Sequence, residues 1–396
     1  MVNLDKFSKQ LPAAFIELCK LITYEGLKVG IVGGVPRDFI LYGHTSFDFD
    51  CELRSIELCH DITSLKRKWA NLLKSLKKEK YFYKELSFGV VRIFSQGAEE
   101  EFECEITMPR AENFTGEKGH SNFIAEHITD ESYSDGFLRR DFTVNAIMFE
   151  FDGECWELID PLGGEQALER KELVACGPDF SLDPVRFLRA FRFAITKGLS
   201  FSSELESQLD QMDLMGLSSF YIKKESEKTN CPLSMFLQMS KTNQSLFKFQ
   251  TPISEINLDL LNRYEYDVFS EIKDHIYCAY FLPIDIRMSL LKKMNLSVKG
   301  SVEVVPLEKK ISLNELSKLS LEDKVFEQAF GIFSILEKKD LTFSALDTLM
   351  HWLKIECTAD EFEKYKKTKY NLTEEDKKLP RNMYRYQIFQ QRVGQV

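Results

Sequence analysis

Two carboxylates one residue apart, Asp48 and Asp50, are the side chains of this 396-residue chain best suited to chemistry. Within a strand, residues i and i+2 face the same side, so both carboxylates face one way while Phe47 and Phe49 pack behind them. Such oxygen donors suit Mg²⁺, which prefers a few carboxylates together with substrate phosphates. Two such ions stabilise the attacking and leaving oxygens of a phosphoryl transfer. The pattern predicts an Mg²⁺ site here; an edge strand with a solvated face is the structural alternative.

A glycine pair precedes these carboxylates. Gly33-Gly34 follows the apolar run 29–32 and comes just before Pro36 and Arg37. Glycines after a strand let the backbone approach a ligand closely, and proline suits the first turn of a helix, so amide hydrogens at that helix start could hold phosphate oxygens. An ordinary turn would explain the glycines alone. Their order with Arg37 and the aspartates favours a phosphate site beside a metal site.

A third carboxylate, Glu105, lies in the alternating stretch 101–107, which predicts an edge strand. Such a strand could bring Glu105 next to the aspartate pair, with a merely solvated side chain as the alternative. The following stretch, 109–135, is polar and has little period, so it predicts a long mobile loop. Loops of that length inside a compact domain are more often functional or disordered than filler.

Charged side chains recur at every third position of one further predicted helix. They are Asp183, Arg186, Arg189 and Arg192, within residues 181–198. Residues i and i+3 are neighbours on a helix, so the spacing predicts one polar stripe on an otherwise apolar surface. Buried arginines need acceptors, and an Arg–Asp pair can match the edge of a nucleotide base. The alternatives are a structural ion-pair network or a carboxylate that caps the helix, with Ser181 as the other candidate cap.

Composition sets the class of protein. The length suggests two to four domains or subdomains, and a net charge of −10 with a pI near 5.4 argues against a protein that coats nucleic acid with its whole surface. Nine cysteines without a Cys-x-x-Cys pair indicate a reducing compartment. Residues 1–22 predict one amphipathic helix that mixes acidic and basic residues, unlike a signal or transit peptide. No apolar run is long enough for a membrane span. We therefore expect a cytoplasmic protein without membrane contact.

The order of predicted elements indicates an α+β protein. A helix over 12–25, the strand 29–32 and a helix within 55–80 come first; further strands are predicted at 89–94 and 101–107, and a hairpin at 139–159. From about residue 165 the patterns are helical. We predict three regions: an α/β head over 1–162, a helical neck over 163–245, and a helical body and tail over 246–396.

Several motifs occur in a specific order. They are Gly33-Gly34 with Arg37-Asp38, Asp48-x-Asp50, Arg139-Arg140-Asp141-Phe142-Thr143-x-Asn145-Ala146, Asp160-Pro161-x-Gly163-Gly164, and Asp183-Pro184-Val185-Arg186-x-Leu188-Arg189-Ala190-x-Arg192-Phe193. This order resembles the class II tRNA nucleotidyltransferase and bacterial poly(A) polymerase superfamily. The resemblance covers roughly residues 27–230. It implies a head of the nucleotidyltransferase fold, followed by an all-helical neck, body and tail.

The resemblance also implies a role for each matching residue. Two Mg²⁺ ions would bind Asp48 and Asp50 and activate an RNA 3′-hydroxyl for attack on the α-phosphate of a nucleotide, with Glu105 as a third carboxylate. Gly34 and Arg37 match positions that contact the triphosphate, and Arg140 matches a nucleotide contact. Asp183 and Arg186 match the pair that reads the base of CTP or ATP, while Arg189 and Arg192 match further nucleotide contacts. Leu182 stands where the base-reading motif usually has a glutamate that braces the arginine.

The resulting prediction is an enzyme that adds CCA to the 3′ end of tRNA from CTP and ATP. Enzymes that add only CC or only A, and poly(A) polymerases, are the alternatives within the superfamily. The acidic chain lacks the strongly basic extension expected of a polymerase that holds arbitrary RNA, which favours CCA addition. A catalytically silent RNA-binding protein is the alternative from another class.

Overall fold

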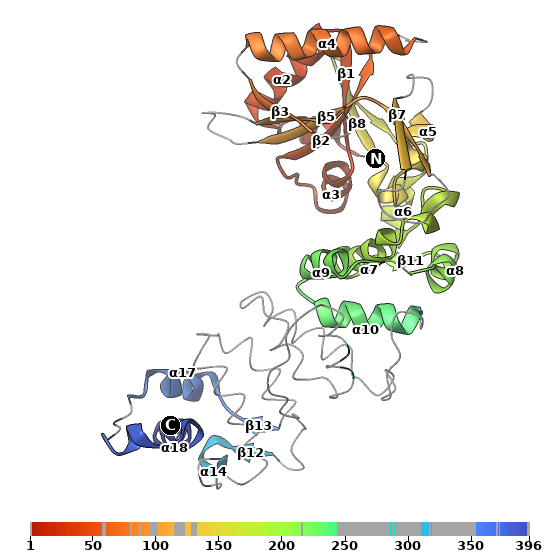
Figure 1. Ribbon diagram of the computed structural model, residues 1–396. Helices are drawn as coiled ribbons and strands as arrows, with labels where there is room; N and C mark the ends of the chain where they lie inside the picture. The colour runs from red at the N-terminus through yellow and green to blue at the C-terminus, as the bar shows by residue number, and fades with distance from the viewer. Residues whose placement is uncertain are drawn as a thin grey trace. The chain divides into compact units, whose positions relative to one another are not determined.

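The computed structural model describes residues 2–57, 61–79, 81–86, 89–94, 102–114, 123–127, 133–214, 217–243, 310–316, 354–369 and 373–393, with positions 286, 289, 318 and 371. The chain divides into two compact units, Met1–Gly216 and Leu217–Val396 (Figure 1). The first unit contains the seven-stranded sheet and all of the predicted site residues. Most of the predicted body and tail lies outside the described residues.

The sheet of the first unit has the strand order β3-β4-β5-β2-β1-β8-β9. All of its strand pairs are antiparallel except the parallel pair of β2 and β5. Its strands are β1 (Leu27–Val32), β2 (Asp48–Ser55), β3 (Phe82–Glu85), β4 (Val91–Phe94), β5 (Glu103–Thr107), β8 (Met148–Phe151) and β9 (Trp156–Ile159). The predicted strand over 29–32 and the predicted hairpin before residue 159 are thereby confirmed.

One face of this sheet is covered by four helices with an aromatic core between them. These are α1 (Leu4–Ser8), α2 (Ala13–Tyr24), α3 (Gly34–Tyr42) and α4 (Ile62–Lys78). Phe15 of α2 stacks on Phe49 of β2 with ring centroids 3.9 Å apart, and Phe7 of α1 packs edge-on against Phe149 of β8. The Asp61 carboxylate caps α4 by accepting a hydrogen bond from the Thr63 amide at 2.9 Å. Apolar residues on alternate strand positions thus fix which residues of β2 face the opposite side.

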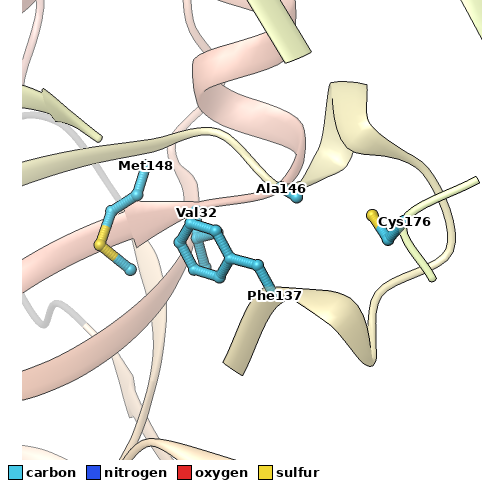
Figure 2. Packing of buried hydrophobic residues seen from close by; sticks show 5 residues of the cluster. All are labelled: Val32, Phe137, Ala146, Met148 and Cys176. Atoms are coloured by element: carbon cyan, nitrogen blue, oxygen red, sulfur yellow. The ribbon is translucent and has the colours of Figure 1, made fainter. Parts of the chain in front are cut away.

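The opposite face of the sheet carries the polar residues of β2 and a smaller apolar cluster. The cluster contains Val32, Phe137, Ala146, Met148 and Cys176, and Figure 2 shows the Phe137 ring beside Val32 and Met148. Phe137 belongs to α5 (Tyr133–Leu138) and is fully buried. Because this ring anchors the end of α5, the next two residues of the chain, Arg139 and Arg140, are held near the sheet.

The rest of the first unit is mainly helical. Its elements are η2 (Thr143–Asn145), α6 (Gly164–Glu169), β10 (Glu172–Leu173), η3 (Pro178–Leu182), α7 (Val185–Lys197), β11 (Ser200–Phe201) and α8 (Ser203–Gln211). Helix α7 contains the arginine stripe and ends at Gly198, whose φ of 64° lies in the left-handed region favoured by glycine. The contacts of α6 to α8 group them with the sheet, up to Gly216.

The second unit is described in short segments. They are α9 (Ser219–Glu227), α10 (Pro232–Thr242), β12 (Ile311–Ser312), α14 (Leu313–Leu316), β13 (Ile355–Glu356), α17 (Ala359–Lys367), η6 (Asp376–Lys378) and α18 (Arg381–Val393). Helices are the main component of its described residues, although β12 and β13 form a two-residue parallel pair. Within the described residues no helix is long and apolar enough to cross a membrane.

Three sequence predictions were wrong in detail. Part of the predicted loop 109–135 is an antiparallel hairpin of β6 (Arg110–Phe114) and β7 (Phe123–His127), because backbone pairing does not require alternating side chains. The strand within 101–107 is not an edge: β5 lies between β4 and β2. The first 22 residues form two helices, since α1 ends at Ser8 and Pro12 precedes α2.

Candidate functional site

The two aspartates lie together at the start of β2. Asp48 and Asp50 are both exposed, while Phe49 between them is buried in the aromatic core. The parallel register places Asp50 opposite Glu105 of β5. The strand alternation predicted for Asp48 and Asp50 is therefore present, and the third predicted carboxylate lies on the neighbouring strand.

The charges around Asp50 show which residues meet at this point. Desolvation by the surrounding protein raises the pKa of Asp50 above its ordinary value, although part of its side chain reaches solvent. Arg140 and Arg189 lower this pKa, and the negative charges of Asp48 and Glu105 raise it. Three acidic and two basic groups from β2, β5, the end of α5 and α7 thus lie within electrostatic range of one another.

Glu105 is already engaged by a neighbour. Its Oε1 accepts hydrogen bonds from both Nε, at 2.8 Å, and Nη2 of Arg92 on β4. In the part of the chain that is described, no group of three or more His, Cys, Asp or Glu side chains is arranged to hold a metal ion. Asp48 and Asp50 stay the predicted carboxylates for a cation, and Glu105 would have to release Arg92 to join them.

The turn at Gly33 lies directly against the aspartates. Gly33 has φ 89° and ψ −116°, a backbone conformation that side-chain-bearing residues rarely adopt. A Cβ at this position would lie 3.7 Å from Asp50 Oδ2 and 3.6 Å from Arg140 Nη1. Gly34 begins α3 immediately afterwards, so amide groups at the start of this helix face the same region. Arg140 Nη1, the atom beside this turn, donates a hydrogen bond to the Asn145 carbonyl at 3.3 Å, and the Nε of the same side chain is buried without a hydrogen-bond partner among the described residues.

Arg37 is held by protein groups. Its Nε and Nη2 donate to the two carboxylate oxygens of Asp38 at 2.8 and 3.0 Å, and its Nη1 donates to Asn145 Oδ1 at 2.6 Å. The residue is buried, and Lys197 of α7 also pairs with Asp38 at 2.9 Å. This arrangement favours a role for Arg37 in fixing α3 against α7. Its predicted contact with a triphosphate would require Nη2, which lies next to Gly34.

Asp141 connects the same residues to the arginine stripe. Its Oδ1 accepts hydrogen bonds from the Phe142 amide at 2.8 Å and Asn145 Nδ2 at 2.9 Å, and its Oδ2 accepts from Arg189 Nε at 2.6 Å. Burial raises the pKa of Asp141, but the charge of Arg189 and these hydrogen bonds outweigh it and lower the pKa to about 2. A continuous chain of hydrogen bonds thus links Arg37 on α3, through Asn145 and Asp141, to Arg189 on α7.

We expect Asp141→Asn to lower the free energy of unfolding by about 2 kcal/mol at pH 7. The folded-state pKa of about 2 lies below the ordinary value of 3.8, so the carboxylate stabilises the fold fully above pH 3.8. This contribution disappears as the pH falls through about 2. Urea unfolding of wild type and variant between pH 7 and 3 should therefore show a difference that shrinks below pH 4. Asp210→Asn, at an exposed position of α8, is the control, and a loss that stays constant with pH would contradict the assignment.

Asp183 and Arg186 lie at the start of α7 and are both buried. The N-cap position of α7 is Pro184, and Asp183 Oδ1, one residue before it, accepts a hydrogen bond from the Val185 amide at 2.9 Å. Arg186 donates to two backbone carbonyls: Nη1 to Asp179 O at 3.3 Å and Nη2 to Arg139 O at 2.5 Å. The Arg186 Nε lies 4.0 Å from Asp183 Oδ2. One oxygen of Asp183 is thus bound to the first amide of α7, while the other faces the arginine.

Phe193, which the sequence reasoning did not single out, is the centre of an arginine cluster. The guanidinium carbons of Arg37, Arg189 and Arg192 lie 5.0, 5.5 and 4.1 Å from the centroid of its ring. Positive charges over an aromatic face are stabilised by the ring quadrupole. Asp141 and Asn145 were also missed as site residues. Their signal was their place in the Arg-Arg-Asp-Phe-Thr-x-Asn-Ala motif.

Comparison with protein-family models gives one match. Residues 29–174 match the family described as "Poly A polymerase head domain". The matched segment begins in β1 and ends just after β10, and it includes the turn at Gly33, both aspartates, Arg140 and Asp141. Asp183 and the arginine stripe follow outside it.

Curated relatives are similar over parts of the chain. A "CCA-adding enzyme" of Alteromonas mediterranea is 28% identical over 215 residues, which cover 52% of this chain and 49% of the relative. A "Multifunctional CCA protein" of Hahella chejuensis is 42% identical over 90 residues, 23% of this chain and 20% of the relative. The chain thus matches half or less of the length of these relatives.

Solved structures resemble the fold over most of the chain. One described as "The structure of CCA-adding enzyme apo form II" has a TM-score of 0.57 at 16% identity and covers 93% of this chain and 88% of its own. Another, a "tRNA nucleotidyltransferase complexed with a primer tRNA and an incoming ATP analog", has a TM-score of 0.50 at 22% identity and covers 85% of this chain and 95% of its own. The α/β head with a helical C-terminal region is therefore the fold of these structures.

Proposed function

We propose, from the match of residues 29–174 to the poly(A) polymerase head domain, that this protein is a template-independent nucleotidyltransferase that adds CCA to the 3′ end of tRNA from CTP and ATP. The observation that carries the proposal is the placement of Asp48 and Asp50 on one face of β2, with the Gly33 turn and Arg140 against Asp50. Carboxylates, a close backbone turn and a cationic donor together suit a nucleoside triphosphate. A protein that only binds RNA would not need this combination.

The donor set at the aspartates fits a hard divalent cation. Asp48 and Asp50 are two exposed carboxylates on one strand face, and their mutual repulsion helps to raise the pKa of Asp50, so a cation between them would relieve unfavourable charge. Mg²⁺ bound there would supply charge stabilisation for the attacking and leaving oxygens of the transfer. Since the pKa of Asp50 is raised, we infer that affinity for Mg²⁺ declines on acidification at a higher pH than for an ordinary aspartate pair.

Residues of the chain itself would hold and orient the nucleotide. In this proposal the amides at Gly34 and the guanidinium of Arg140, whose Nη1 lies beside the Gly33 turn, bind negatively charged oxygens beside the aspartates. Arg37 and Arg189 take part in this proposal mainly through Asp38, Asn145 and Asp141, which they hold in place. Fixing these groups before the nucleotide binds lowers the entropic cost of reaching the reactive geometry.

Base selection is assigned in this proposal to Asp183 and Arg186. An arginine offers paired donors and a carboxylate offers acceptors, a combination that can match the edge of cytosine or adenine. For Asp183 and Arg186 to bind a base, Arg186 must release one backbone carbonyl. Asp183 must use Oδ2, because its Oδ1 accepts the hydrogen bond from the Val185 amide. Arg192, stacked on Phe193, is the remaining arginine of the stripe proposed to contact the nucleotide.

The test is addition to a tRNA transcript that ends before CCA. With Mg²⁺ and CTP and ATP, supplied singly and together, we expect two C residues and then one A, and no addition after chelation of the metal. Gel resolution of the products separates the possible outcomes. Addition of only C, only A or a long A tail would replace this proposal with one of the related activities. A tRNA that is bound but not extended would support a silent RNA-binding protein.

A further inference from the structure

Strand β2 contains two more charged residues after Asp48 and Asp50, and unlike the aspartates they are buried. Glu52 and Arg54 follow at alternate positions, so they lie on the same face of the strand as the aspartates. Both are almost completely buried, with 1% and 2% of their surface exposed. A buried carboxylate loses its hydration and is stable only where protein groups replace it. The partners of Glu52 therefore indicate what it is for.

One oxygen of Glu52 is fully used within the strand. Its Oε1 accepts hydrogen bonds from Nε and Nη2 of Arg54 at 2.9 and 2.7 Å. The Arg54 guanidinium in turn lies over the Tyr133 ring, 4.1 Å from its centroid. Oε1 of Glu52 and Arg54 thus form a local ion pair, and this pair does not use Oε2.

The second oxygen of Glu52 faces a different part of the molecule. Glu52 Oε2 is buried and has no hydrogen-bond partner among the described residues, and its ion-pair partner is Arg139 Nη2 at 3.7 Å. Arg139 follows directly after α5. The backbone carbonyl of Arg139 accepts the 2.5 Å hydrogen bond from Arg186 Nη2. Arg139 thus connects Glu52 and Arg186: its side chain pairs with Glu52, and its backbone carbonyl accepts the hydrogen bond from Arg186.

This connection matters because of how Arg186 is held. Its hydrogen bonds go to two backbone carbonyls, and the nearest carboxylate oxygen, Asp183 Oδ2, is 4.0 Å from its Nε. A backbone carbonyl can hold a guanidinium in one orientation only if the peptide group of that carbonyl is itself held in place. Outer partners of this kind commonly affect activity when they are removed, because they set the direction of the group that touches the ligand.

We propose that Glu52 is a positioning residue for nucleotide selection: through Arg139 it fixes the carbonyl that orients Arg186. The inference rests on the proposed function, in which Arg186 reads the base. It couples the strand of the two aspartates to the helix of the arginine stripe. Nucleotide choice should then depend on a residue that touches neither the nucleotide nor the RNA.

Glu52→Gln tests this coupling, because it keeps an oxygen for Arg54 and removes the charge that attracts Arg139. We expect discrimination, measured as the ratio of kcat/KM for CTP or ATP over that for UTP and GTP, to fall about tenfold. Arg139→Gln, which keeps the backbone carbonyl but removes the guanidinium, should give the same loss, and the double variant should be no worse than either single one. Agreement of the two single variants also guards against a fold defect confined to Glu52.

Glu225→Gln is the matched control. Glu225 is a glutamate of comparable burial on α9, where it pairs with Lys228 at 2.6 Å. A purely structural role for Glu52 predicts that both variants lower the melting temperature and leave discrimination unchanged. That result, or fully additive effects of Glu52→Gln and Arg139→Gln on discrimination, would overturn the proposal.

The proposed function and this inference can fail separately. If the wild-type protein extends no RNA, the proposed function fails, and equilibrium titration with CTP, ATP, UTP and GTP then decides the inference by the same comparison of variants. Selective binding that Glu52→Gln weakens would support the coupling. Binding without selectivity in the wild type, or no nucleotide binding, would overturn it.

Discussion

Asp50→Asn and Asp48→Asn should each lower the rate of nucleotide addition by on the order of 10³-fold or more, because each removes one of two charges that would hold Mg²⁺. The fold should survive both changes. The folded state raises the pKa of Asp50, so the charged carboxylate is disfavoured there at neutral pH, and replacing it with a neutral amide removes that penalty. We therefore expect the melting temperature of Asp50→Asn to match or exceed that of the wild type.

Single-turnover addition of CMP to a tRNA transcript, followed across an Mg²⁺ titration, is the measurement. Glu157→Gln is the control, because Glu157 is exposed on β9 of the same sheet and its substitution removes the same single negative charge. Near-normal addition by Asp50→Asn at ordinary Mg²⁺ concentrations would refute the metal assignment. A large fall in melting temperature would instead show that the carboxylate has a structural role.

Gly164→Ala is expected to have the largest effect on stability, at least about 3 kcal/mol. A Cβ at Gly164 would lie 2.3 Å from the carbonyl oxygen of Thr143 and 2.6 Å from Cγ1 of Ile147, so α6 would have to move away from η2. The η2 segment includes Asn145, and a shift there would also disturb the hydrogen bonds that Asn145 makes with Arg37 and with Asp141. Activity should fall together with stability.

The adjacent glycine provides a matched control. Gly163 has φ 70°, and a Cβ at this position would meet no described neighbouring atom within 4 Å, so Gly163→Ala causes only backbone strain of about 1–2 kcal/mol. Urea unfolding of the two variants measures the difference directly. Equal losses, or a greater loss for Gly163→Ala, would show that close approach to Thr143 is not what requires glycine at position 164.

The local patterns of the sequence predicted the parts of the fold that depend on local periodicity. Alternation of Phe and Asp in β2 predicted both its buried face and its paired carboxylates, and the apolar run before Gly33 predicted β1. The hairpin of β6 and β7 was missed because its pairing comes from backbone hydrogen bonds, which leave a weak trace in side-chain periodicity. The position of β5 inside the sheet was missed because strand order depends on contacts between distant segments.

In the site, too, side chains that are far apart in the sequence pair with one another, and local patterns do not predict such pairs. Arg37 and Asn145 are 108 positions apart, and Arg189 and Asp141 are 48 apart, so no local pattern could pair them. Several residues of the motifs act electrostatically on Asp50, and what each one binds stays a prediction. Arg37 was expected to face a triphosphate, and its guanidinium is bound by Asp38 and Asn145. Glu105 was expected as a third carboxylate, and it is paired with Arg92.

Strand β2 has charged residues on one face and apolar residues on the other, and this alternation limits how the length of the strand can change in evolution. Asp48, Asp50, Glu52 and Arg54 lie on one face, while Phe49, Cys51 and Leu53 form part of the core on the other. Inserting or deleting one residue would exchange the two faces, burying carboxylates and exposing the aromatic core at once. Homologous strands should therefore differ by substitution while insertions and deletions collect in the flanking turns. A library that varies only Asp48 and Asp50, the exposed members of the polar set, could diversify the chemistry without altering the core.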